Sequence, residues 1–340
     1  MARHWTAMRG VLTVVLLASA IACGQSGRGD PNGPQEIVVS NYGVTVNGMP
    51  FAVAAALGYF EDEGAAVSGI LSSSGGGSTV RNLLGGNLAY AETSLASVVA
   101  AAASGADLKI VSGNAHTVAE FYWLVMPDSP IVDLEDIEGK TLGFTNPRST
   151  SQALNTLLLR RLGLDPDDVG TVNTGGFGPM LVALEQGAVD VAPVADPMYT
   201  QNKDKYRVLV AATDVLPALT NVVGVTTVDA ADTRGDFIRA VIRARRRAVE
   251  FIYANPEEAA ILIAPEYGLD VAVTQEILEN LIAGGQASGT HYWGPGNILY
   301  EPMDAMIAAQ RDVGAIAGAG RIDWSRLVDE RFLPDDLADE

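Results

Sequence analysis

Three short segments combine glycine with hydroxyl or amide side chains, each directly before a stretch of helical character. They span residues 74–78, 146–151 and 174–178. Unpaired backbone N–H groups at a helix N-terminus attract anions and carbonyl oxygens, glycine lets a ligand approach the backbone, and serine and threonine add hydroxyl groups. The candidate ligand-binding residues in these segments are Ser74, Gly76, Gly77, Asn146, Ser149, Thr150, Gly176 and Phe177. The alternative for each segment is a turn that caps its helix and binds nothing.

Two other pairs of residues follow predicted strands, where ligands bind in open α/β sheets. Asn41 and Tyr42 follow a strand that ends at Ser40, and the Tyr42 ring could stack on a flat ligand. Thr93 and Ser94 follow a strand that ends near Ala91. The alternatives are a surface or core position for the first pair and a helix cap for the second.

Two charged side chains suggest opposite ligand chemistries. Arg148 is the only cation within residues 146–151, so it could pair with an acidic ligand or simply be solvated. Asp196 could recognise an amine or could begin a helix. Helix ends together with Arg148 favour an oxygen-rich group such as a sulfonate or carboxylate. Amine recognition by Asp196 is the alternative.

Composition excludes several classes of function. The 340 residues are 48% hydrophobic, enough for a packed core, and the formal net charge of −19 disfavours binding to nucleic acid. One cysteine and three histidines exclude a disulfide framework and a cysteine-rich metal site. The lysines lie outside the candidate segments and are Lys109, Lys140, Lys203 and Lys205. We therefore expect no catalytic residue, no metal and no cofactor.

The N-terminus resembles a bacterial lipoprotein signal. A basic start precedes an apolar run, residues 11–21, which is too short to span a bilayer as a helix. Ala20-Ile21-Ala22-Cys23 resembles a lipobox, with cleavage before Cys23 and lipid on its sulfur, and a polar Gly/Ser/Pro-rich segment follows. The alternative is an ordinary secretory signal with a chance cysteine. We assign residues 1–22 to the signal peptide and 23–35 to a flexible tether.

The remaining chain alternates between strand and helix patterns, which predicts a parallel α/β sheet. Expected strands are residues 36–40, 66–71, 88–91 and 108–112, and expected helices include 50–57 and 95–103.

Two similar lobes are suggested by a repeated order of Gly-rich loop, helix, Gly turn and short strand, which follows both Ser74 and Thr174. Apolar strands at 121–126 and 221–226 would connect the lobes as a hinge. The predicted fold class is therefore α/β with two Rossmann-like lobes and a two-strand hinge. Lobe 1 would hold residues 36–119 and 224–340, and lobe 2 would hold residues 120–223.

Five motifs in order resemble the nitrate/sulfonate/taurine-type substrate-binding proteins of ABC importers, a family that includes binders of thiamine-precursor pyrimidines. The motifs are Gly58-Tyr59-Phe60-Glu61-Asp62-Glu63-Gly64, the segment Asp133 to Gly143, Leu184-Glu185-Gln186-Gly187-Ala188-Val189-Asp190, Ala195-Asp196-Pro197 and Asn255-Pro256-Glu257-Glu258-Ala259. The chain departs from the family pattern at Ala195, where an aromatic residue is usual, and at Pro147-Arg148, where glycine often precedes the serine.

This resemblance implies a type II periplasmic-binding, or Venus-flytrap, fold that closes on a small organic solute. The implied partners are an ABC permease and its ATPase, and the implied location is the extracytoplasmic face of the membrane, with Cys23 as lipid anchor. We expect a monomer. The alternatives are a ligand-sensing module for a membrane receptor and, as some relatives with this fold are, an enzyme.

Overall fold

The computed structural model describes residues 33–318 and 320–337, so the lipobox-like segment and Cys23 lie outside the described residues. A six-stranded sheet forms the centre of what we call the first lobe. Its strands in spatial order are β11 (Trp293–Gly296), β4 (Leu108–Ala115), β10 (Val222–Thr227), β3 (Ala91–Ser94), β1 (Gln35–Ser40) and β2 (Val67–Ser73). β1 pairs in parallel with β2 and β3, whereas β10 is antiparallel to both of its neighbours.

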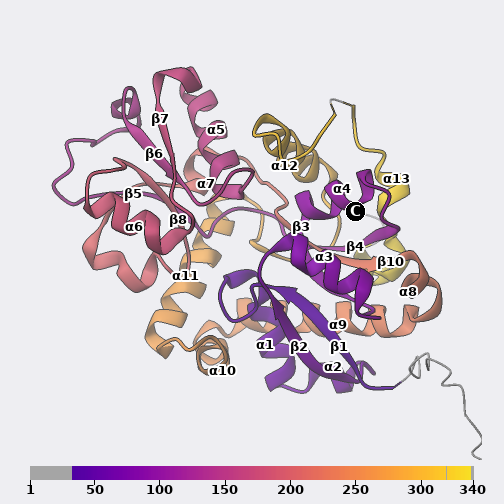
Figure 1. Ribbon diagram of the computed structural model, residues 1–340. Helices are drawn as coiled ribbons and strands as arrows, with labels where there is room; N and C mark the ends of the chain where they lie inside the picture. Colours follow the sequence, from indigo (N-terminus) through magenta and orange to yellow (C-terminus); the bar gives the residue numbers. More distant parts are fainter. Residues whose placement is uncertain (1–32, 319, 338–340) are drawn as a thin grey trace, which may run out of the picture. The chain divides into compact units, whose positions relative to one another are not determined.

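Helices cover both faces of this sheet because its strands are apolar on both sides. Ile37 and Val39 pack in one buried cluster, and Val38 between them packs in another. The helices are α1 (Met49–Ala56), α2 (Tyr59–Asp62), α3 (Gly76–Gly85), α4 (Leu95–Ala103), α8 (Val228–Thr233), α9 (Gly235–Ala254), α10 (Pro256–Tyr267), α11 (Val271–Ser288), α12 (Tyr300–Asp312) and α13 (Trp324–Leu327). Figure 1 shows α3 and α9 on opposite sides of the strands.

The second lobe contains two smaller groups of strands. Antiparallel β8 (Ala192–Ala195), β5 (Phe121–Val125) and β9 (Arg207–Ala211) form one sheet, and β6 (Thr141–Phe144) pairs in parallel with β7 (Gly170–Asn173). The helices here are α5 (Thr150–Leu162), α6 (Phe177–Glu185) and α7 (Ala212–Val215). In Figure 1 these elements are grouped around β5 to β8.

The predicted α/β class is confirmed, with local differences. The strand expected at 88–91 lies at Ala91–Ser94, so Thr93 and Ser94 are the last residues of β3 and do not follow it. The expected strands at 121–126 and 221–226 form as β5 and β10, and each pairs within the sheet of one lobe. The chain passes between the two sheets in the non-strand segments 116–120 and 216–221. No helix among the described residues is both long enough and apolar enough to cross a bilayer.

Candidate ligand-binding cleft

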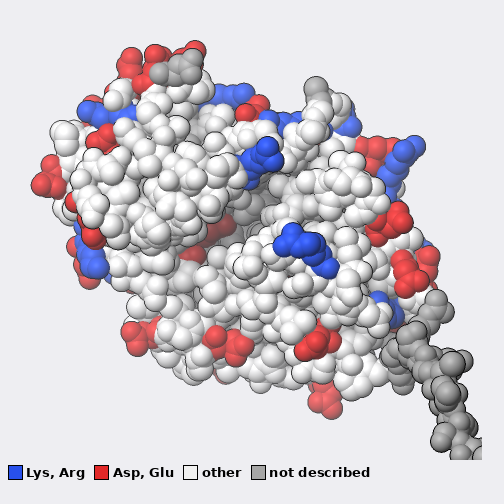
Figure 2. Space-filling model, in the orientation of Figure 1, with Lys and Arg blue, Asp and Glu red and all other residues white. Residues whose placement is uncertain are grey.

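A cavity of about 400 Å³ lies between loops of the two lobes, a size that suits a small molecule. The first lobe contributes Asn41 and Gly76, and the second contributes Ser149 and Phe177. Figure 2 shows the surface hollowed between the atoms over α6 and those over α3, with acidic surface visible inside the hollow. We call this cavity the cleft.

Most of the candidate residues predicted from the sequence line the cleft. They are Asn41, Gly76, Thr93, Ser94, Asn146, Arg148, Ser149, Thr150, Phe177 and Asp196. Ser74, Gly77 and Gly176 are adjacent to lining residues but are not part of the lining.

The three predicted helix N-termini are present as the starts of α3, α5 and α6. Ser149 is the N-cap of α5, and its side chain accepts a hydrogen bond from the Gln152 N–H at 3.3 Å. Gly76 is needed for packing, because a Cβ there would lie 2.2 Å from the Ser97 Oγ. The capping interpretation therefore holds for Ser149. The absence of a side chain at Gly76 allows the start of α3 to lie close to the start of α4, which contains Ser97.

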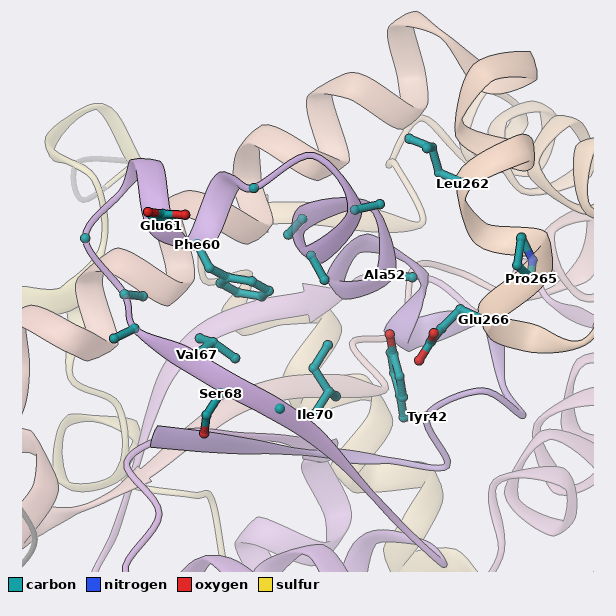
Figure 3. Close-up of a pocket in the computed structure, with 18 residues that line it drawn as sticks. Tyr42, Ala52, Phe60, Glu61, Val67, Ser68, Ile70, Leu262, Pro265 and Glu266 are labelled. Carbon is teal, nitrogen blue, oxygen red and sulfur yellow. The ribbon is translucent and has the colours of Figure 1, made fainter. Parts of the chain in front are cut away.

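Tyr42 lies outside the cleft, contrary to a role in stacking there. Asn41 has φ of 52°, and this left-handed turn after β1 directs the next side chain away. The Tyr42 ring packs edge-on against Tyr267, with centroids 5.8 Å apart. Figure 3 shows it beside Glu266, in a different cavity of about 880 Å³ in the first lobe. Burial and the Glu266 carboxylate both raise the pKa of Tyr42.

Arg148 lies at the rim of the cleft. Its side chain is exposed, and its guanidinium makes no ion pair within the described part of the chain. Its backbone has φ of 68°, and its N–H donates to the Gln152 Oε1 at 2.7 Å. Solvent screens the charge of an exposed arginine, so Arg148 in this position interacts only weakly with a ligand deeper in the cleft.

Asp196 has a structural role in the turn after β8 and also lines the cleft. Its Oδ1 accepts hydrogen bonds from the Thr200 N–H at 3.0 Å and from the Thr200 hydroxyl at 2.7 Å, which orders the turn after β8. Its Oδ2 is buried in the cleft lining and has no hydrogen-bond partner within residues 33–318 and 320–337. Burial raises the pKa of Asp196 to about 6, against the opposing hydrogen bonds from Thr200.

Glu120 is the main site residue that the sequence did not reveal. It is 6% exposed and lines the cleft, and its Oε2 has no hydrogen-bond partner in the part of the chain that the structure describes. Burial is the main cause that raises its pKa to about 8, and the nearby Asp196 carboxylate raises it further. One signal was available, because Glu120 is the acidic residue directly before the apolar Phe121–Val125 run, so it had to lie at a strand end.

Other polar residues missed in the sequence also line the cleft. Asn221 accepts a hydrogen bond from the Thr150 hydroxyl at 3.4 Å, which joins α5 to the segment that returns to the first lobe. The remaining missed polar residues are Ser40, Thr45, Asn47, Ser97, Thr145, Ser151 and Gln310, and Tyr292, from a Gly/Pro-bounded loop that could reach the cleft rim, also lines the cavity. The rings of Phe121 and Phe177, with centroids 6.0 Å apart, give the cleft an apolar wall.

Comparison with known proteins places the chain in a family. A family model described as NMT1/THI5-like matches residues 45–259. The chain belongs to the NMT1/THI5-like family. The resemblance predicted from the five sequence motifs is thereby confirmed. A search of curated proteins finds no match.

Several solved structures share the fold of this chain but have low sequence identity to it. The periplasmic aliphatic sulphonate-binding protein SsuA of Escherichia coli is 21% identical, with 84% of this chain and 86% of that chain covered and a TM-score of 0.68. SsuA of Xanthomonas axonopodis pv. citri, solved with bound MOPS, is 19% identical over 88% and 98%, with a TM-score of 0.65. The nitrate-binding protein NrtA of Synechocystis PCC 6803 is 13% identical over 88% and 86%, with a TM-score of 0.62. These likenesses show the periplasmic-binding-protein fold.

Proposed function

We propose that this protein is the solute-binding component of an ABC importer and delivers a small organic solute to the permease. The observation that supports this most directly is the cleft, because polar residues from both lobes line one cavity of small-molecule size. The solved sulphonate- and nitrate-binding proteins that share the fold are consistent with it. The protein acts as a binder and not as an enzyme.

The proposed mechanism is closure of the lobes on the solute. A ligand that touches both lobes gains contacts only when they approach, so it shifts the population towards the closed form by its difference in affinity for the two forms. The chain passes between the sheets in two short segments, 116–120 and 216–221, where this movement would be centred. The permease then recognises the closed form.

Native mass spectrometry followed by small-angle scattering tests this function. Protein purified without refolding should carry a small molecule that dissociates on denaturation. Returning that molecule to the emptied protein should reduce the radius of gyration. Protein that never carries a small molecule, or that binds it without compaction, would contradict the proposal.

We further propose that Cys23 carries a lipid that anchors the protein at the extracytoplasmic face of the membrane. The lipobox-like run Ala20-Ile21-Ala22-Cys23 and the polar tether after it support this. Cys23→Ser should abolish labelling by an alkyne fatty acid and release the protein from the membrane fraction, while the control Ser26→Ala should change neither. Undiminished labelling of Cys23→Ser would disprove the anchor.

A further inference from the structure

Three buried acceptor atoms that line the cleft have no hydrogen-bond partner among the described residues. They are the Glu120 Oε2, the Asp196 Oδ2 and the Gln310 Oε1. Leaving a buried acceptor unsatisfied is unfavourable, and more so when the group is charged. The buried side-chain donors without a partner belong to Tyr267 and Arg311, and neither residue lines the cleft. The cleft therefore has an excess of acceptors that a bound ligand with N–H or O–H donors would satisfy.

The two carboxyl groups are held next to each other by the sheet of the second lobe. Glu120 directly precedes β5, Asp196 directly follows β8, and these strands are antiparallel with Phe121 opposite Ala195. The Asp196 N–H donates to the Glu120 C=O at 2.8 Å, which extends the ladder by one pair at the cleft. The two acids thus form one built site, which we call the acid pair.

The groups that act on the acid pair are acidic or neutral. Besides the Asp196 carboxylate, hydrogen bonds from the side chains of Tyr292 and Asn221 act on Glu120, and they lower its pKa against the effect of burial. Asp196 is influenced by Thr200, by Tyr122 and by the Glu276 carboxylate on α11. Neither Lys nor Arg is among the main influences on either carboxyl. A ligand anion placed here would lie beside a buried acid pair on which no cation is a main influence, which is unfavourable.

We propose, on the basis of the solute-binding function proposed above, that the cleft selects a small organic ligand with a cationic nitrogen group, an ammonium or amidinium, whose N–H groups donate to Glu120 and Asp196. The charge of the ligand compensates the pair, and each charge-assisted hydrogen bond satisfies an acceptor that lacks a partner. The Gln310 Oε1 accepts from a further donor on the same ligand. This ligand class differs from the sulphonate and nitrate named for the solved structures of the same fold.

Calorimetric titration with matched pairs of compounds tests the proposal. Each pair differs chiefly in the charge of one group: benzamidine against benzamide, butylammonium against butanol, and taurine against isethionate. In the full chain, the cationic member of at least one pair should bind about tenfold or more tightly than its partner, a difference of about 1.4 kcal/mol. Equal affinity within every pair that binds, or tightest binding by isethionate or nitrate, would overturn the proposal.

Variants of Glu120 and Asp196 test whether the acid pair causes the preference for the cationic compound of each pair. Glu120→Gln and Asp196→Asn keep the shape of each side chain and remove its charge, and the amide that replaces the Asp196 carboxylate retains a carbonyl oxygen for the Thr200 bonds. Each should lose most of the preference for the cation. The control Glu61→Gln removes one exposed carboxylate at the other cavity and should leave the preference unchanged. A preference that persists in the double variant Glu120→Gln/Asp196→Asn would place the cation elsewhere and overturn the proposal.

A proton count gives a second, independent readout. A cation that binds the pair favours its ionised form, so binding near pH 7 should release a proton that the free pair holds. Titration of benzamidine in phosphate and in Tris buffer should therefore give different apparent enthalpies, and Glu120→Gln should abolish the difference. Binding of benzamidine by wild-type protein with no proton release would contradict recognition by the pair.

The solute that the protein retains during purification separates this proposal from the function on which it rests. A retained amine or amidine supports both. A retained sulfonate, nitrate or neutral solute supports solute binding and overturns cation selection. If no solute is retained and no compound of the panel binds, both proposals fail.

Discussion

Two buried glutamates, one in the core of the first lobe and one at the cleft, have opposite surroundings. Glu92 on β3 is fully buried, and its carboxylate accepts from the Asn47 Nδ2 at 2.9 Å and from the Arg245 Nε at 3.2 Å. The Asn114 Nδ2 also donates to it. Glu120 is almost as buried, but it faces the carboxyl group of Asp196 and leaves one oxygen without a donor.

The hydrogen-bond partners of the two glutamates indicate different roles, a structural one for Glu92 and availability to a ligand for Glu120. Burial raises the pKa of Glu92, and the Arg245 charge and three hydrogen-bond donors oppose that rise. Arg245 also donates to the backbone C=O groups of Gly294 and Asn114, both at 2.7 Å, so it joins α9 to the strands. The donors and the cation that face Glu92 belong to the chain itself, whereas the Glu120 Oε2 has no donor among the described residues.

Breaking the compensated pair should have the largest effect. Arg245→Met leaves the Glu92 carboxylate buried without its cation, and loss of one partner of a buried pair costs about 3–5 kcal/mol. Urea denaturation should show that loss in the free energy of unfolding. On the same helix, Arg239 forms an exposed i,i+3 ion pair with Asp236, and Arg239→Met should cost less than about 1 kcal/mol. Equal losses in the two variants would show that Glu92 does not depend on Arg245.

The pH dependence of stability should expose the uncompensated acid. Because the pKa of Glu120 is raised to about 8, the folded protein binds this proton more tightly than the unfolded chain does. Its contribution to stability is complete below the unfolded pKa, near 4.5, and is lost as the pH rises through about 8. Without ligand, the free energy of unfolding of the wild type should therefore fall relative to Glu120→Gln by at most about 1.4 kcal/mol per pH unit in this window.

Denaturation at a series of pH values measures this difference, which includes the titration of Glu120 and its coupling to Asp196. Parallel curves for the wild type and Glu120→Gln would mean that Glu120 is already compensated within the chain.

The smallest effect is expected at Arg148, at the rim of the cleft. Arg245 compensates the charge of Glu92, and a variant of Arg148 tests whether an exposed cation compensates Glu120 in the same way. Arg148 is solvated, so Arg148→Ala should change the affinity for benzamidine by less than about 0.5 kcal/mol. Titration calorimetry checks this value. A loss of about 1.5–3 kcal/mol in the affinity for a small organic acid would instead support pairing between Arg148 and an anion.

The sequence predicted the helix ends of the cleft because their signals are local. A Gly/Ser segment before a helical pattern is readable over a few residues, and the starts of α3, α5 and α6 all lie where such segments occur. The α/β class and the strands β1, β2 and β4 follow in the same way from short apolar runs.

The parts that could not be predicted depend on pairing between distant segments. Glu120 is a ligand-binding candidate only because β5 and β8 are antiparallel neighbours, which brings it against Asp196. A lone glutamate after Val118-Ala119 carries no sign of that partner. Tyr42 shows the converse, because it follows the end of β1, as predicted for a site residue, yet lies outside the cleft after the left-handed residue Asn41. The buried network of Glu92 and Arg245 likewise joins residues from separate parts of the chain.

The backbone hydrogen bond from Asp196 to Glu120 makes the acid pair part of a sheet, whereas Arg148 lies in a loop. Strand ladders fix the separation of paired backbones, so the backbone positions from which the two acidic side chains extend are set before any ligand arrives. Little conformational entropy is then lost at this site on binding, and the spacing of the acids acts as a fixed template. Under the cation selection proposed above, a ligand would therefore be distinguished by the spacing of its N–H groups as well as by its charge.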